Sequence, residues 1–249
     1  MIFLHGGGDN PVNRQETFGR FTQAATINSI CNIALVVAEE SEDLAHKSFE
    51  EYKDIFTSLP ISPTKIHPIL VSPNHPLTRN VLESIQPSGV FVCGGVTPTY
   101  HQSLCLDISW VNYLQERRIC YGGTSAGAAV AANKAILGGW QATRNAETRA
   151  ILFQGASEGL GLITIHNGLG LVPFSIDVHA SQMGTLTRLI HAVELGLVTE
   201  GWAIDENTIL EVENDKMTVY GEGHVYQVWK KDDQPVNIKV QIAPECIIR

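Results

Sequence analysis

The chain has 249 residues, with 26 acidic against 17 basic side chains and a formal net charge of −9. An acidic chain in which Lys and Arg never run longer than a pair is not expected to bind nucleic acid or an anionic membrane, and a small molecule is the expected partner. The sequence has no run of about 18 apolar residues and no signal-peptide pattern at its start, so we expect a cytoplasmic protein.

Hydrophobic residues make up 44% of the sequence, which is enough for one sizeable core, and we expect a single domain over residues 1–249. The five cysteines are an odd number and include no C-x-x-C pair, so they indicate neither a disulfide framework nor a zinc site. We therefore expect reduced thiols, no metal and no cofactor.

The first half of the chain alternates short apolar runs with segments of helical periodicity. Strands are predicted over 2–4, 32–37, 66–71 and 89–93, and helices over 14–30, 41–59, 77–85 and 100–116. Strands that alternate with helices at this spacing pair in parallel through right-handed crossovers. The pattern predicts a three-layer, doubly wound α/β fold with a mostly parallel sheet.

The stretch from Ile119 to Val130 passes from an apolar run through small residues into an Ala-rich segment, which is typical of strand, sharp turn and helix. Within it, Gly123-Thr124-Ser125-Ala126-Gly127 fits the G-x-S-x-G form of a nucleophile elbow. Ser125 is therefore a candidate nucleophile, and the N–H of Ala126 is a candidate oxyanion donor. Two other interpretations stay open: a turn that only packs closely, and a phosphate-binding loop, which the missing lysine disfavours.

Two further glycine loops follow strands of the predicted sheet. Gly6-Gly7-Gly8 comes after the first strand, and we expect it to lie beside the site and allow a close approach rather than carry chemistry. Gly94-Gly95-Val96 comes after the fourth strand, on the edge where doubly wound sheets bind ligands. The N–H of Gly95 or Val96 is a candidate second oxyanion donor, although an ordinary tight turn would show the same residues.

Beyond the elbow the pattern is less regular. Residues 138–149 and 155–170 are glycine-rich and are predicted to form loops and short strands that border the site. The segment 208–229 alternates as an antiparallel hairpin or meander would. The fold prediction therefore includes a C-terminal antiparallel hairpin.

A histidine at the end of a predicted strand is the candidate general base. His179 precedes a predicted helix over 181–195, and a side chain at such a junction can reach an active site. Acyl transfer by a serine needs a base, and a carboxylate that orients the base, and these can lie far apart in the sequence. His5, His166 and His191 are competing candidates.

Two carboxylates end the apolar run that begins at Gly201. Because successive residues of a strand face opposite ways, Asp205 and Glu206 cannot both point at His179. Glu147, in the glycine-rich region, is a further candidate for the carboxylate that orients the histidine, because a loop there could fold over the site. The residues alone leave this choice open.

Several of these motifs occur together and in order, and they resemble the peptidase E and cyanophycinase family of serine peptidases. The resemblance covers most of the chain, and the elbow and the run Ile204-Asp205-Glu206 are its most specific pieces. The matching segments are the strand into Gly6-Gly7-Gly8, Phe91 to Gly95, Gly123 to Ala128, Asp177 to His179 with Arg188, and Gly201 to Glu206.

This resemblance implies a flavodoxin-like fold related to class I glutamine amidotransferases, with serine in place of their cysteine. It implies cleavage of dipeptides or aspartyl peptides, and it suggests a homodimer. Carried over by position, Ser125 matches the nucleophile, His179 the general base and Glu206 the favoured acid. Gly95 and Ala126 match the oxyanion donors.

The family pattern is altered where the substrate would bind. Cyanophycinases resemble one another in a glutamine before the histidine and two arginines after it, whereas this chain has Val178 and Thr185 in two of these places and keeps only Arg188. We expect substrate contacts at Arg188, Thr97 and Asp177. A guanidinium suits a carboxylate, so a short peptide with one carboxylate is the expected substrate and cyanophycin a poor one. Alternatively, Arg188 is a surface residue paired with an acid on its own helix.

The sequence therefore predicts a hydrolase, a serine-type peptidase that acts on small peptides through an acyl-enzyme. An esterase or amidase with the same elbow is one alternative, because the motif specifies acyl transfer and not the leaving group. A related protein without activity that binds a ligand or partner is another, as is a nucleotide-binding protein of the Rossmann type.

Overall fold

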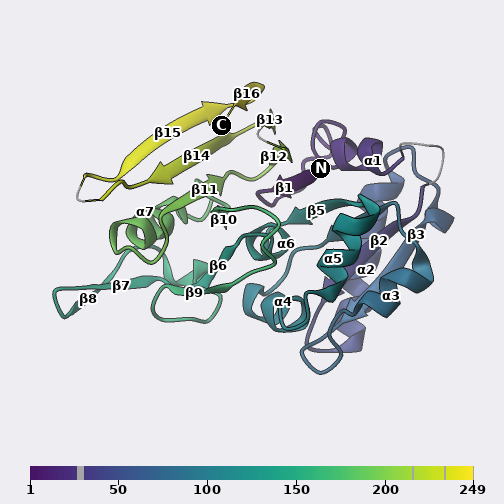
Figure 1. The fold of residues 1–249 in the computed structure, drawn as a ribbon, viewed down its shortest axis with the longest axis horizontal. Helices are drawn as coiled ribbons and strands as arrows, with labels where there is room; N and C mark the ends of the chain where they lie inside the picture. Colours follow the sequence, from purple (N-terminus) through teal and green to yellow (C-terminus); the bar gives the residue numbers. More distant parts are fainter. Residues whose placement is uncertain (27–30, 215, 233, 249) are drawn as a thin grey trace.

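An eight-stranded sheet runs through the computed structural model, which describes residues 1–26, 31–214, 216–232 and 234–248 (Figure 1). Its strand order is β16-β13-β12-β1-β5-β4-β2-β3. The strands from β1 onward in this order are parallel; they are β1 (Ile2–His5), β5 (Cys120–Thr124), β4 (Gly89–Val92), β2 (Ile33–Ala38) and β3 (Ile66–Val71). The apolar strand β2 is buried along its whole length, as expected for a parallel strand covered on both faces. A mixed α/β fold with a mainly parallel central sheet is thereby confirmed.

Three antiparallel strands complete this sheet beyond β1. They are β12 (Thr208–Glu213), β13 (Lys216–Gly221) and β16 (Glu245–Ile248). The pair β12 and β13 falls where the alternating pattern predicted an antiparallel hairpin. The next strand, β14, leaves this sheet, so the segment predicted over 208–229 is divided between two sheets.

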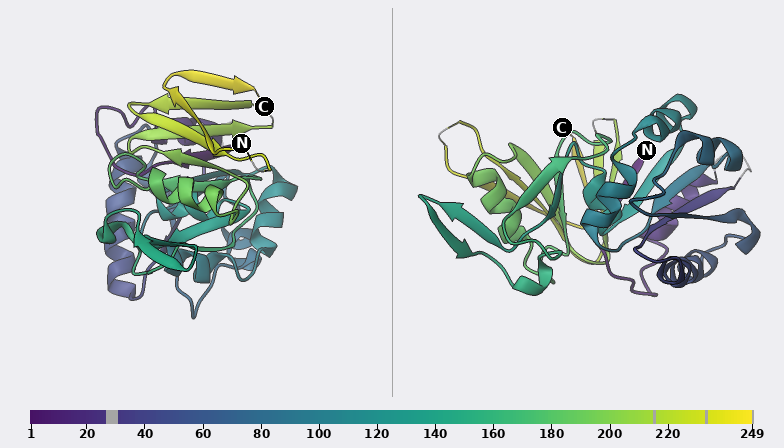
Figure 2. Two further views of the ribbon diagram at one scale, coloured as in Figure 1. Left: turned by 90° about the vertical axis from the view of Figure 1, so that its left-hand side faces the viewer. Right: turned by 90° about the horizontal axis from the view of Figure 1, so that it is seen from below.

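Helices cover both faces of the central sheet, and the sheet separates the apolar core into two parts (Figure 2). One face carries α1 (Phe18–Ala25) and α2 (Glu42–Thr57). The other face carries α3 (Arg79–Ile85), α4 (Thr97–Leu104), α5 (Ser109–Arg117) and α6 (Ala126–Val130). In the part of the chain that the structure describes, no helix combines the length and apolarity needed to cross a membrane.

The single helix predicted over 100–116 is wrong. Residues 105–108 interrupt it and divide it into α4 and α5. Asp107 stabilises the start of the second helix, because its carboxylate accepts the N–H of Ser109 at 2.8 Å. The interruption contains neither glycine nor proline, so the sequence pattern did not reveal it.

Two other predicted helices are shorter than expected. The helix predicted over 181–195 is α7 (Leu186–Glu194), which begins only after Gly184 has taken a φ of +70°. The helix predicted over 14–30 is α1, and residues 27–30 of that prediction lie outside the described residues.

A second, four-stranded sheet stands beside the first, and the sequence did not predict it as a separate sheet (Figure 1). Its members in order are β10 (Ser175–Val178), β11 (Glu200–Ile204), β14 (His224–Trp229) and β15 (Asn237–Ile242). Leu189 and Val193 of α7 pack on this sheet in a third apolar cluster. Trp202 and Ile204 instead belong to the cluster of the central sheet, so the two sheets share part of one core.

Short antiparallel pairs occupy the region between α6 and β10. They are β6 (Lys134–Gly138) with β9 (Thr164–Asn167), and β7 (Gln141–Arg144) with β8 (Glu147–Ala150). The β7–β8 hairpin projects from the rest of the molecule (Figure 1). Single turns of 3₁₀ helix occur at η1 (Pro63–Lys65) and η2 (Gln154–Ala156).

Candidate active site

The serine of the elbow lies where β5 turns into α6, at the carboxyl end of the parallel strands. Ser125 has a φ of 51° and a ψ of −116°, which a non-glycine residue adopts only where its surroundings hold it. Its N–H donates to the carbonyl oxygen of His5 at 3.0 Å. Glycines make the turn possible: a Cβ on Gly123 would lie 2.4 Å from the carbonyl oxygen of Gly127, and one on Gly127 would lie 2.2 Å from that of Val92. The strained turn presents the Ser125 hydroxyl at the edge of the sheet.

A histidine that follows β10 contacts this hydroxyl. Nε2 of His179 is 2.8 Å from Oγ of Ser125, and Nδ1 is 2.8 Å from Oε1 of Glu206. The side chains of His179 and Glu206 are 16% and 27% exposed, so these hydrogen bonds are partly shielded from water. With the ring proton assigned to Nδ1, where it donates to Glu206, Nε2 is left to accept the serine hydroxyl. A base in this state can take the hydroxyl proton.

The three candidate carboxylates have different partners in the structure. Glu206, in the loop after β11, is the one that contacts the imidazole of His179. Asp205 turns away and accepts two backbone N–H groups at 2.9 Å, one from the loop after β10 and one from β14. Glu147 lies in the exposed β7–β8 hairpin, where it forms a surface ion pair.

Among the described residues, no imidazole of the competing histidines hydrogen-bonds to the hydroxyl of Ser125. His5 is buried beneath the elbow, with Nδ1 2.9 Å from Oγ1 of Thr124. Burial lowers the pKa of His5 to about 3, so its ring is neutral at ordinary pH. His166 packs edge-on against another histidine, and His191 lies on α7.

The glycine triplet after β1 lies directly against the histidine and its carboxylate. Gly7 has a φ of +102°, and a Cβ there would lie 2.1 Å from Cε1 of His179. The carbonyl oxygen of Gly6 accepts the N–H of His179 at 2.9 Å. A Cβ on Gly8 would lie 3.0 Å from Cβ of Glu206. The triplet therefore permits the close approach that the sequence suggested.

The candidate oxyanion donors come from the start of α6 and from the loop after β4. Ala126 is the first residue of α6, so its N–H has no acceptor within that helix. Gly95 lies between β4 and α4, and no hydrogen bond found outside the helices and strands of the described residues uses its N–H. Gly95, Ser125 and His179 line one cavity of about 510 Å³.

The residues expected to bind substrate are engaged within the chain. Nε and Nη2 of Arg188 donate to the two carboxylate oxygens of Asp177 at 2.8 and 2.6 Å, and both side chains are almost fully buried. Nη1 of Arg188 donates to the carbonyl oxygen of Ala156 at 2.8 Å. The paired N–H donors of Arg188 that would hold a substrate carboxylate are thus occupied by Asp177. The alternative expectation, in which Arg188 is a surface residue, is wrong because Arg188 is buried. Thr97 is also buried, and its N–H donates to Oε2 of Glu158 at 3.1 Å.

Sequence reasoning missed several polar residues around the serine. Burial raises the pKa of the Glu158 carboxyl, against the opposing effects of the Thr97 N–H and of nearby Arg188 and His179. Its irregular glycine-rich loop carries no signal that would reveal it. Asp9, in contrast, follows the glycine triplet at the carboxyl end of β1, where ligands of parallel sheets bind. Asp9 lines the cavity of Ser125, and the other missed residues that line it are Arg14, Glu51, Tyr52 and Asp54.

The fold and the site together define an α/β protein in which a serine, a histidine and a carboxylate are joined by hydrogen bonds. No family model matches the chain. A peptidase from an acI-B1 actinobacterium has a similar structure, with a TM-score of 0.69 and 15% identity over 100% of this chain and 96% of that one. A candidate peptidase E protein from Listeria monocytogenes EGD-e is also similar, with a TM-score of 0.53 and 12% identity over 89% of this chain and 98% of that one. At these identities the likeness shows a shared fold.

Proposed function

We propose that this chain is a serine-type peptidase that hydrolyses small peptides through an acyl-enzyme. The observation that carries the proposal is the hydrogen-bonded triad of Ser125, His179 and Glu206, in which each of the two hydrogen bonds measures 2.8 Å. Such a triad activates a hydroxyl that is otherwise a weak nucleophile. The similar fold of two proteins named as peptidases supports this class of reaction.

In the first half-reaction, Oγ of Ser125 attacks the peptide carbonyl carbon while Nε2 of His179 takes the hydroxyl proton. Glu206 orients the imidazole through Nδ1 and stabilises the imidazolium that forms. The imidazolium then gives its proton to the leaving amine as the C–N bond breaks, and the acyl group stays on Ser125 as an ester. In the second half-reaction, His179 takes a proton from water as the water oxygen attacks the ester carbon, and the C–Oγ bond then breaks as the imidazolium returns the proton to Oγ and the acid product leaves.

Negative charge develops on the carbonyl oxygen during both attacks, and donors that are already in place stabilise it best. We assign this role to the N–H groups of Gly95, in the loop after β4, and of Ala126, which follows Ser125 at the start of α6. The N–H of Ser125 itself is occupied by the carbonyl oxygen of His5. Loss of one such donor costs about 10²- to 10³-fold in kcat in a serine peptidase.

The proposal is tested with a dipeptide library and the variant Ser125→Ala. Hydrolysis should fall by at least about 100-fold, because loss of a nucleophile ordinarily costs more than that. Ser62→Ala, which removes an exposed hydroxyl that does not line the cavity of Ser125, is the matched control and should keep wild-type activity. Peptide hydrolysis that survives Ser125→Ala would show that the roles are wrongly assigned.

Two further measurements separate the alternatives. A fluorophosphonate probe should label the wild type at Ser125, whereas an unlabelled wild type would indicate a binding protein without acyl-transfer activity. A panel of p-nitrophenyl esters, compared with the dipeptides, distinguishes a peptidase from an esterase. Cleavage of esters alone would favour the esterase.

A further inference from the structure

Two tyrosines from different helices hold one glycine of the loop that follows β4. The N–H of Gly94 donates to the hydroxyl oxygen of Tyr52, which lies on α2, at 2.9 Å. The hydroxyl of Tyr100, which lies on α4, donates to the carbonyl oxygen of Gly94, also at 2.9 Å. Side chains therefore bind both polar groups of the Gly94 backbone.

This glycine lies between a tyrosine and the candidate nucleophile. A Cβ on Gly94 would be 2.8 Å from the hydroxyl oxygen of Tyr52 and 3.1 Å from Cβ of Ser125. A Cβ on Gly95 would be 2.7 Å from Cε2 of Tyr100. The two tyrosines thus pack directly on the loop, and a larger residue at either glycine would displace a tyrosine or the serine.

The hydrogen bond from Tyr100 determines where the next N–H points. The C=O of Gly94 and the N–H of Gly95 belong to one planar trans peptide group, in which they point in opposite directions. Holding the Gly94 oxygen on Tyr100 therefore sets the direction of the Gly95 N–H. Tyr52 restrains the preceding peptide group in the same way, so neither group can rotate without losing a hydrogen bond.

The two tyrosines are themselves fixed by the fold. Tyr100 is fully buried and belongs to the apolar cluster that packs on the central sheet. Tyr52 extends from α2, which packs on the central sheet. Burial raises the pKa of both phenols, so both hydroxyls stay protonated at working pH. The loop is thereby tied to α4 on one side and to α2 on the other.

We propose that Tyr52 and Tyr100 are positioning residues that preset the N–H of Gly95 as an oxyanion donor. The proposal rests on the proposed function, in which Gly95 stabilises the oxyanion. A donor lowers the barrier most when it needs no reorganisation during the reaction. A misplacement of 1 Å in an active site can cost about 10²-fold in rate, so loss of one restraint should be measurable.

The experiment uses Tyr52→Phe and Tyr100→Phe, each of which removes one oxygen atom and keeps the ring. Labelling of Ser125 by a fluorophosphonate, whose phosphoryl oxygen occupies the oxyanion position, should slow about 10- to 100-fold in both variants. On the best dipeptide, kcat should fall by a similar factor while KM changes by less than about twofold, because the donor acts in the transition state.

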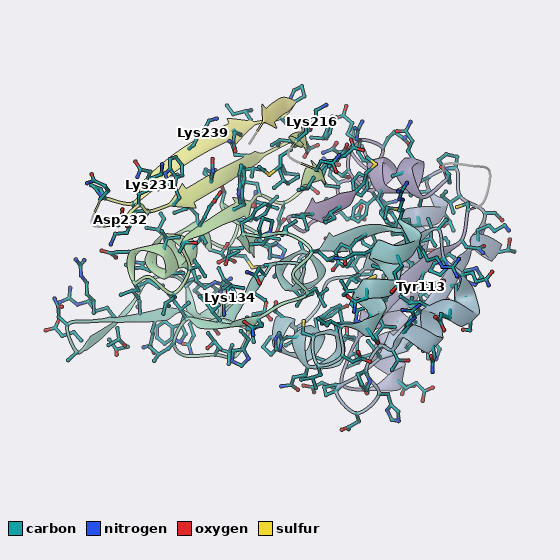
Figure 3. The ribbon with its side chains drawn as sticks, in the orientation of Figure 1. Tyr113, Lys134, Lys216, Lys231, Asp232 and Lys239 are labelled. Atoms are coloured by element: carbon teal, nitrogen blue, oxygen red, sulfur yellow. The ribbon has the colours of Figure 1, made fainter. Side chains whose placement is uncertain are left out.

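Tyr113→Phe is the matched control. Tyr113 lies on α5 (Figure 3) and lines a different cavity together with Arg117 and Ile119. That cavity is at the amino end of β5, whereas Ser125 follows the carboxyl end of β5. This variant should be labelled at the wild-type rate. Wild-type labelling in both Tyr52→Phe and Tyr100→Phe would overturn the proposal, as would a loss confined to KM.

A structural measurement separates this proposal from the proposed function. If the wild type is not labelled, the proposed function fails, and crystal structures of the two variants then decide the positioning role. The proposal requires that the peptide group between Gly94 and Gly95 rotates or takes two orientations when a hydroxyl is removed. An unchanged peptide group in both variants would contradict it, whatever the activity.

Discussion

Removal of the buried imidazole of His5 should make folding stability less sensitive to acid. The ring is 1% exposed, and its Nδ1 receives the N–H of Gly7 at 3.3 Å and contacts Oγ1 of Thr124 at 2.9 Å. A second ring proton would therefore have to be placed on Nδ1, facing the N–H of Gly7. Burial, with a smaller contribution from His179, lowers the pKa of His5 from 6.5 to about 3.

The sign and size of the effect follow from this pKa. Between about pH 6.5 and pH 3 the unfolded chain binds a proton at His5 and the folded chain does not, so stability falls as the pH falls through this range. At 1.36 kcal/mol per pH unit below pH 6.5, the loss between pH 7 and pH 4.5 is roughly 2 to 3 kcal/mol from this residue. Down to pH 3, where the folded chain begins to bind the proton as well, the loss is about 4 kcal/mol.

The assay is urea unfolding at pH 7 and at pH 4.5 for the wild type and for His5→Asn. The asparagine oxygen can take the place of Nδ1 as an acceptor but does not titrate, so the acid-induced loss should be smaller than that of the wild type by roughly 2 to 3 kcal/mol. His46→Asn, which removes an exposed histidine, is the control and should retain the wild-type loss. Equal losses in the wild type and His5→Asn would refute the reasoning, because the buried ring would then titrate as it does in the unfolded chain.

Two further predictions concern the surroundings of the histidine. Gly7→Ala should lower kcat/KM by about 100-fold or more while leaving the protein folded by circular dichroism, because the new methyl group would displace the ring of His179; wild-type activity would show that the loop adapts. Arg188→Met should lower the free energy of unfolding in urea by about 3–5 kcal/mol, because it leaves the buried carboxylate of Asp177 without a partner. Adding Asp177→Asn should recover part of that loss, and a loss below about 1 kcal/mol in the single variant would show that the carboxylate reaches water.

The parallel strands could be predicted because their residues carry a strong local signal. β2 is a run of apolar residues between polar segments, and a central strand buried on both faces requires such a run. The second sheet could not be predicted in the same way. β12, β13 and β14 were predicted together from an alternating pattern over 208–229, and such a pattern does not show which sheet a strand joins. The break between α4 and α5 was hidden because Leu106 continues the apolar pattern although it is 73% exposed.

The sequence located the ends of the elements that carry Ser125, His179 and Glu206, and the structure brings these three side chains together. It did not reveal which polar residues face one another inside the protein. Asp177 and Arg188 were read as two groups available to a substrate, but β10 and α7 pack together and bury them as an ion pair. Such pairing depends on how elements pack, which spacing along the chain does not show.

The end of β1 organises the whole site through its backbone. The carbonyl oxygen of His5 accepts the N–H of Ser125 at 3.0 Å, and that of Gly6 accepts the N–H of His179 at 2.9 Å. The carbonyl oxygen of Gly7 accepts the N–H of the residue after Glu206 at 2.7 Å. Three consecutive residues therefore align the three segments that carry Ser125, His179 and Glu206. Ser125 and His179 both have positive φ angles, of 51° and 56°, and each such conformation costs on the order of 1 kcal/mol or more unless the surroundings hold it. Because these restraints come from the end of β1 and the two glycines that follow it, one short stretch of backbone positions all three segments.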